Sequence, residues 1–123
     1  MKTRILFFLI LAFISNCFAS NNTYGTILPT SIKIRVIDIN QNTVEGVVVT
    51  LYGNEKDYRA KENPLSESKI TNRHGIVVFK KLKPQAYFVH AVKGNTSNAG
   101  EEVLTEKLFE GRINKVTTLI SND

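Results

Sequence analysis

The chain has 123 residues, of which 42% are hydrophobic, and its 16 lysines and arginines exceed its 11 acidic residues for a formal charge of +5. This length fits one domain and excludes a multidomain enzyme. The chain contains one cysteine, so it cannot form an intramolecular disulfide and must be stabilised by packing.

The N-terminus has the pattern of a secretory signal peptide. Lys2 and Arg4 precede an apolar run over residues 5–14, which is shorter than the roughly 20 residues that a helix needs to span a bilayer. Small and polar residues follow up to Ser20. We therefore expect residues 1–19 to be a signal peptide and the mature protein to be periplasmic, outer-membrane-associated or secreted.

Two processing routes are open at Cys17. Cleavage before Ser20 satisfies the small-residue rule of signal peptidase and discards the cysteine. Ile14-Ser15-Asn16-Cys17 also resembles a bacterial lipobox, in which the cysteine is lipidated, although Asn16 departs from the usual small residue. We favour the first route. In the second, Cys17 is the membrane anchor, and membrane contact is expected only through that lipid.

The mature chain carries too little charge to predict a nucleic-acid partner. Removal of Lys2 and Arg4 leaves 14 basic against 11 acidic residues, a net charge of +3. Proteins that bind nucleic acids usually show a basic stripe on a strongly basic domain.

The remaining sequence predicts a tether and then one β domain. Residues 20–31 are polar and lack periodicity, which is typical of a flexible tether. Residues 32–123 alternate short apolar stretches with turns and contain no convincing helical period. Strands are predicted over residues 32–36, 44–52, 68–71, 76–79, 86–92, 103–109 and 113–120, with long loops at 53–67 and 93–100. About seven short strands at this spacing predict an all-β, Greek-key β-sandwich.

A set of apolar and turn positions carries a family resemblance. The set is Val36-x-Asp38, Val44-x-Gly46-Val47-x-Val49-x-Leu51, Thr71-x-x-x-Gly75 and Phe79-x-x-Leu82-x-Pro84-x-x-Tyr87-x-Val89. It resembles the carboxypeptidase regulatory-like domains, which are transthyretin-like (prealbumin-like), immunoglobulin-like sandwiches related to collagen-adhesin B-type repeats. The resemblance covers residues 32–92 well. It implies the fold and leaves the function open.

The residues that carry out chemistry in related domains have no counterparts at the matching positions of this chain. Some adhesin repeats form a Lys–Asn or Lys–Asp isopeptide bond next to a buried Glu, and the resemblance puts Val36 and Ala91 at the Lys and Glu positions. The related hydroxyisourate hydrolase ends in Tyr-Arg-Gly-Ser, whereas this chain ends in Leu-Ile-Ser-Asn-Asp. His74 and His90 lack a matched carboxylate or nucleophile. We predict no catalytic residues, no cofactor and no enzyme activity.

One loop has a spacing of oxygen donors that occurs in calcium sites. Asp38, Asn40 and Asn42 alternate along the chain, but no glutamate closes the loop and no glycine lies within it. An Asx-rich hairpin turn is the favoured interpretation, and no metal site is predicted.

Candidate contacts with a ligand or partner are Tyr58, Arg59 and Lys93, which lie in or beside the two long loops. Lys80, Lys81 and Lys83 are expected to gather with Lys93 at one end of the sandwich, where they would meet an acidic partner or protect an edge strand.

The predicted function is that of a non-enzymatic exported module which acts in interaction or structure at the bacterial cell envelope. Its partner is an envelope protein or glycan that the sequence does not identify. A glycan-binding module that uses Tyr58 is the alternative, and a transthyretin-like hydrolase is less favoured.

Overall fold

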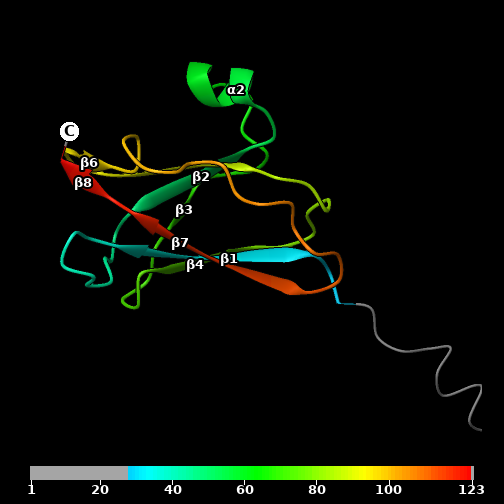
Figure 1. The fold of residues 1–123 in the computed structure, drawn as a ribbon, viewed down its shortest axis with the longest axis horizontal. Coiled ribbons are helices and arrows are strands. Elements are labelled where there is room, and N and C mark those ends of the chain that lie inside the picture. Colours follow the sequence, from blue (N-terminus) through cyan, green and yellow to red (C-terminus); the bar gives the residue numbers. More distant parts are fainter. Residues whose placement is uncertain (1–27, 123) are drawn as a thin grey trace, which may run out of the picture.

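The computed structural model describes residues 28–122, which form two facing sheets and one short helix (Figure 1). The first sheet has the order β4 (Ile76–Phe79), β1 (Ser31–Ile37), β7 (Ile113–Leu119). The second has the order β3 (Lys69–Ile70), β2 (Val48–Tyr52), β5 (Phe88–Lys93), β6 (Thr96–Ser97), β8 (Ser121–Asn122). This architecture confirms the predicted all-β sandwich. The predicted signal peptide, Cys17 and most of the tether lie outside the described residues.

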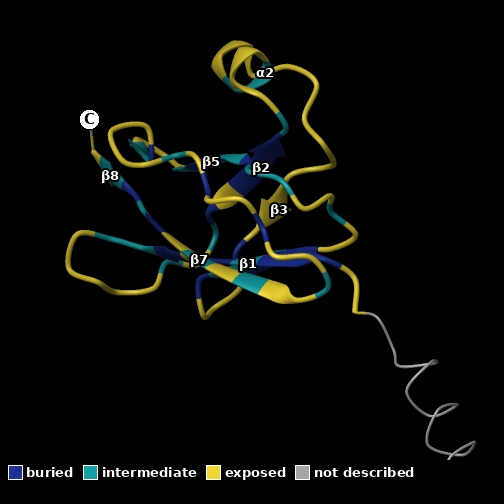
Figure 2. Ribbon diagram, turned by 45° about the vertical axis from the view of Figure 1, so that its right-hand side comes forward, coloured by how far each residue is buried: buried dark blue, intermediate teal, exposed yellow. Residues whose placement is uncertain are grey.

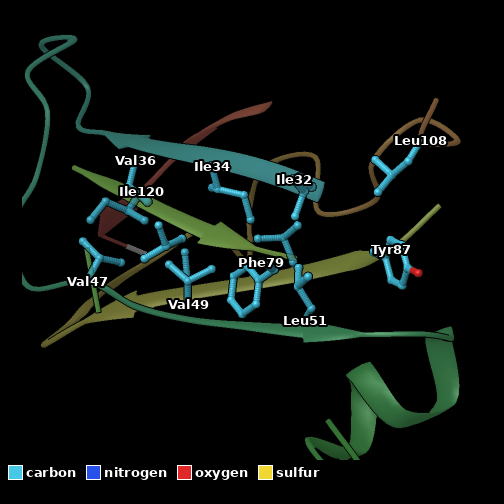
Figure 3. Close-up of a cluster of buried hydrophobic side chains, with 13 residues drawn as sticks. Ile32, Ile34, Val36, Val47, Val49, Leu51, Phe79, Tyr87, Leu108 and Ile120 are labelled. Atoms are coloured by element: carbon cyan, nitrogen blue, oxygen red, sulfur yellow. The ribbon is translucent and has the colours of Figure 1, made fainter. Parts of the chain in front are cut away.

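The core follows from the alternation of side chains along β1. Ile32, Ile34 and Val36 face inward and are fully buried, whereas Lys33 and Arg35 face outward. The inward residues pack against apolar side chains of the second sheet, and Tyr87 and Leu108 close one end of the same cluster (Figure 3). The alternation of apolar and charged residues in the sequence of β1 therefore arises because one face of the strand is buried.

Strand β1 lies between partners of opposite direction. It pairs antiparallel with β4 and parallel with β7, where Ser31 lies opposite Ile113 and Ile37 opposite Leu119. After β7 the chain crosses through buried Ile120 to β8 in the other sheet. This crossing joins the two sheets at one end, while β7 stays at the edge of the first sheet.

Several predicted element boundaries are wrong. Strand β2 begins at Val48, not at residue 44, because Gly46 adopts a positive φ of 80° in the turn before it. Residues 103–109 form no strand. They make only an isolated bridge from Leu104 to Phe88, since the segment leaves β5 after a few backbone hydrogen bonds. Strand β6 appears within the predicted loop 93–100, and β8 lies just beyond the last predicted strand, which ends at residue 120.

The predicted loop over residues 53–67 contains helix α2 (Glu55–Ala60). The Asn54 side chain caps this helix by accepting a hydrogen bond of 2.9 Å from the backbone N–H of Asp57. Among residues 28–122, no helix is both long and apolar enough to cross a membrane.

Candidate interaction surfaces

Tyr58, which the sequence predicts in a loop, lies in helix α2 and packs onto the outer face of the second sheet. Its ring stacks on Phe88 with centroids 5.4 Å apart, and it meets Tyr52 edge-on at 5.9 Å. The Lys61 Nζ lies 3.7 Å from the centroid of the Tyr58 ring. These contacts already occupy the ring that a sugar would need for stacking, so Tyr58 acts as the anchor of α2 on the sheet.

Burial under α2 changes the titration of the groups around Tyr58. Burial raises the pKa of the Tyr58 hydroxyl, an effect that the neighbouring Arg59 charge opposes. Burial also lowers the pKa of Lys61. The pKa of His90 is lowered by burial first and by the Lys61 charge second. All three shifts favour the uncharged form of the side chain, which fits a packing role for Tyr58, Lys61 and His90.

The three candidate contact residues do not form one site. Arg59 pairs with Glu55 on the exposed side of α2, with 2.7 Å between guanidinium and carboxylate. Lys93 lies at the far end of β5 and donates a hydrogen bond of 2.6 Å to the Glu45 carbonyl. The six residues of β5 extend about 20 Å, which separates Lys93 from Tyr58 above Phe88.

The same strand also divides the expected lysine cluster. Lys83 lies beside the start of β5, where its carbonyl accepts a hydrogen bond from the Tyr87 hydroxyl, whereas Lys93 ends that strand. Lys80 and Lys81 precede Lys83 at the end of β4. The structure thus places three of these lysines at one end of the sandwich and Lys93 toward the other.

The residues with possible catalytic or metal-binding chemistry lie in turns, on β5 or in the core. Asp38 Oδ1 accepts backbone hydrogen bonds from Asn40 and Asn42, so this carboxylate organises a turn. His74 lies in the exposed turn between β3 and β4, whereas His90 lies on β5 beside Tyr58. No group of three or more metal-binding side chains occurs within residues 28–122. Val36 and Ala91, at the positions that the resemblance assigns to isopeptide chemistry, are fully buried in the core.

A groove of about 550 Å³ runs between β7 and the segment of residues 102–109. Leu104, Phe109 and Ile113 along it are 44%, 64% and 55% exposed. Val116 lies deeper and packs against the core cluster. Figure 2 shows the exposed stretch of β7 beside the more deeply buried β1. The groove is therefore an opening between the sheets with an apolar rim.

The backbone of β7 adds hydrogen-bonding capacity to this groove. The parallel ladder starts with Ser31 N–H donating to the Arg112 carbonyl and ends with Ile120 N–H donating to the Ile37 carbonyl. The alternation of a strand then directs the N–H and C=O groups of Lys115 and Thr117 away from β1. Within the described chain, no other strand pairs with this edge.

Sequence reasoning missed this groove for a physical reason. The sequence predicts strands over residues 103–109 and 113–120, joined through residues 110–112, whereas only the second of these forms. Which edge stays open depends on the parallel pairing of β1 with β7, two strands from opposite ends of the domain. The exposed Phe109 and Ile113 were a signal, but their exposure is visible only in the folded protein.

Comparisons with known proteins show similarity of fold. No family model matches the chain, and no curated protein matches it. A streptococcal ancillary pilin superposes with a TM-score of 0.58 at 16% identity, covering 78% of this chain and 33% of the pilin. BcpA, the major pilin subunit of Bacillus cereus, superposes with a TM-score of 0.54 at 13% identity, covering 78% of this chain and 31% of BcpA. The chain thus spans about a third of these structures and shares their β-sandwich fold.

Proposed function

We propose that this protein is a non-enzymatic exported module of the bacterial cell envelope, which binds an extended segment of a partner protein along the free edge of β7. The groove beside β7 carries this proposal. It combines unpaired backbone groups with an apolar rim, the two features that strand addition uses for affinity and specificity. The pilin-like fold supports a role at the cell surface in interaction or structure.

The expected occupant is a strand with apolar side chains at alternate positions. Inward side chains of such a strand would cover Val116, outward ones would lie beside Ile113 at the rim, and its backbone would bond to Lys115 and Thr117. We also propose that the sandwich is a carboxypeptidase regulatory-like or transthyretin-like domain. This assignment rests on the sequence pattern of residues 32–92.

The contacts of the Tyr58 ring disfavour the alternative of a glycan stacked on it. Phe88 and Lys61 already contact it, so a stacked sugar would have to displace one of them. Contact of a partner with Arg59 or Lys93 remains a separate prediction, because both are exposed and lie away from the groove.

Site-specific photo-crosslinking in the native cell tests the proposal. A benzophenone amino acid at position 109 places the probe on the rim of the groove, and the same probe at position 56 on α2 serves as the control. We expect a covalent adduct with an envelope protein from position 109 and none of comparable yield from position 56. Equal adducts from both positions would overturn the assignment of the groove.

A strand-blocking variant separates edge binding from general stickiness. Thr117→Pro removes an N–H that points to the free edge and leaves the ladder to β1 intact. It should abolish the adduct from position 109 while melting close to wild type. The matched control Thr117→Ala retains the N–H and should keep the adduct. Persistence of the adduct in a folded Thr117→Pro protein would contradict strand addition.

The mass of the exported protein tests the predicted export. A chain that begins at Ser20 would establish cleavage by the ordinary route, whereas a lipid-modified chain that begins at Cys17 would establish a membrane anchor. Recovery of the uncleaved 123-residue chain in the cytoplasm would contradict export.

A further inference from the structure

The outer face of the first sheet carries a group of cations. Lys33 and Arg35 alternate with the buried residues of β1 and therefore point outward. Lys115 on β7 lies directly beside Lys33 in the parallel register. A hollow of about 180 Å³ lies among these three side chains, together with Val116 and Thr117. Adjacent strands are about 4.8 Å apart, so the cations are close neighbours.

This group has no internal counter-charge. No acidic residue lines the hollow. Within residues 28–122, the ion pair that forms is Arg59 with Glu55 on α2, at the opposite side of the sandwich (Figure 1). Like charges on neighbouring strands oppose folding. The cations at this face are therefore a cost to stability that an external anion would relieve.

The two sheets differ in what covers their outer faces. Helix α2 lies over β2 and β5 of the second sheet through Tyr58, whereas no described helix or strand lies over the outer face of the first sheet (Figure 1). By the strand register, Ile37, Ile76, Val78 and Leu119 on this face are half-buried, and one apolar side chain, Ile113 on the edge strand, is exposed. Binding to a bilayer surface usually adds apolar side chains that insert among the lipids. A flat basic face around a small hollow fits a soluble polyanion better.

We propose that the outer face of the first sheet binds an anionic polysaccharide, with one charged sugar unit in the hollow between Lys33, Arg35 and Lys115. The hollow is smaller than the sites of about 300–1,000 Å³ that hold drug-sized ligands, which matches one unit of a longer chain. Neighbouring units would continue over the exposed Lys80 at the end of β4. This binding goes beyond the proposed function, because it uses the sheet face and not the edge groove.

Binding of the exported protein to sodium polygalacturonate, measured by calorimetry, tests this assignment. The wild type should bind the polysaccharide more weakly as salt rises from about 50 to about 200 mM, as counterion release requires. The double variant Lys33→Gln/Lys115→Gln should lose about tenfold in affinity at the lower salt. Lys56→Gln/Arg59→Gln removes the same formal charge from α2 and should bind like wild type.

A stability measurement gives a second readout that does not depend on the ligand. Lys33→Gln/Lys115→Gln should melt at a higher temperature than wild type at low salt, and the difference should shrink at high salt. Phe109→Ala, on the rim of the groove and outside the hollow, keeps every cation and should bind polygalacturonate like wild type, which distinguishes this face from the groove.

Three results would overturn the proposal. The first is an equal loss of affinity in the two double variants, which would indicate a response to net charge alone. The second is binding to phosphatidylglycerol-containing vesicles without binding to polygalacturonate, which would identify a membrane surface as the partner. The third is no measurable binding at about 50 mM salt, where electrostatic attraction is strong.

Discussion

At the scale of single residues, the side chain of one buried asparagine makes hydrogen bonds to β5 that a neighbouring strand would otherwise make. Asn98 is fully buried, and its Oδ1 accepts a hydrogen bond from the Ala91 N–H at 3.0 Å while its Nδ2 donates to the Val89 carbonyl at 2.9 Å. Its Nδ2 also donates to Thr118 Oγ1 on β7. One side chain therefore completes the edge of β5 and links the two sheets, which a shorter apolar residue could not do.

Asn98→Ala is expected to destabilise the protein by about 3 kcal/mol, because two backbone groups of β5 lose their buried partners. Urea unfolding measures this change. Asn95→Ala, in the exposed turn after β5, is the matched control and should cost less than about 0.5 kcal/mol. A similar free energy of unfolding for the two variants would show that the Asn98 side chain is dispensable.

Two glycines adopt left-handed backbone conformations, and only one of them also lacks room for a Cβ atom. Gly75 and Gly94 have φ values of 72° and 57°, and an added Cβ would lie 2.8 Å from the Val36 carbonyl oxygen at Gly75 but meet nothing within 4 Å at Gly94. Gly94→Ala should cost about 1 kcal/mol from backbone strain alone.

Gly75→Ala should cost at least about 2 kcal/mol more than Gly94→Ala, because the backbone of β1 must move. Chemical denaturation of both variants measures this difference. Equal costs would mean that the turn before β4 yields without disturbing β1.

At the scale of elements, Tyr58 holds α2 to the sheet, and the histidine beside it is shifted toward its neutral form. His90 contacts Tyr58 edge-on at 6.5 Å, and burial together with Lys61 lowers the pKa of His90. In the unfolded chain this pKa returns to about 6.5. As the pH falls below that value, the unfolded state takes up the proton first, so the free energy of unfolding decreases until the folded state also protonates.

His90→Gln should therefore flatten the pH dependence of stability between about pH 7 and about pH 5. Unfolding curves of wild type and variant across this range provide the measurement. His74→Gln changes a histidine in an exposed turn that packs against nothing in α2, and it should leave the wild-type slope. A slope unchanged by His90→Gln would place its origin elsewhere in the molecule.

The elements also show how far the sequence can predict this protein. Strands such as β1 and β4 were predictable because burial of one face produces an alternating pattern of residues in the sequence. Helix α2 was missed although Asn54 and Asp57 form a capping signal, because six residues are too few to show a helical period. Strands β6 and β8 have two residues each and are set by pairing, which no local pattern encodes.

The candidate sites were harder to predict than the fold. The sequence marks Tyr58 as a candidate contact in a loop, whereas the structure places it in α2, and its packing on Phe88 depends on α2 lying over the sheet. The groove and the basic face both depend on the pairing of β1 with β7. That neighbourhood joins residues that are distant in sequence, so composition and spacing do not reveal it.

At the scale of the whole molecule, the sandwich has three unlike surfaces. Helix α2 lies over part of the second sheet (Figure 1), the first sheet exposes a basic face, and the edge at β7 opens into a groove with an apolar rim. A similar fold occurs in a streptococcal ancillary pilin and in the major pilin subunit of Bacillus cereus. The uncovered edge and face are therefore the parts of the molecule available to partners.

The central claim is that β7 offers a free strand edge, and residue-resolved amide hydrogen exchange of the isolated exported protein tests it most directly. The amides of Asn114, Val116 and Thr118 belong to the ladder with β1 and should exchange slowly, whereas those of Lys115 and Thr117 should exchange rapidly. This alternation is the predicted result. Protection of Lys115 and Thr117 equal to that of their neighbours would show that the edge is already covered and would contradict the account.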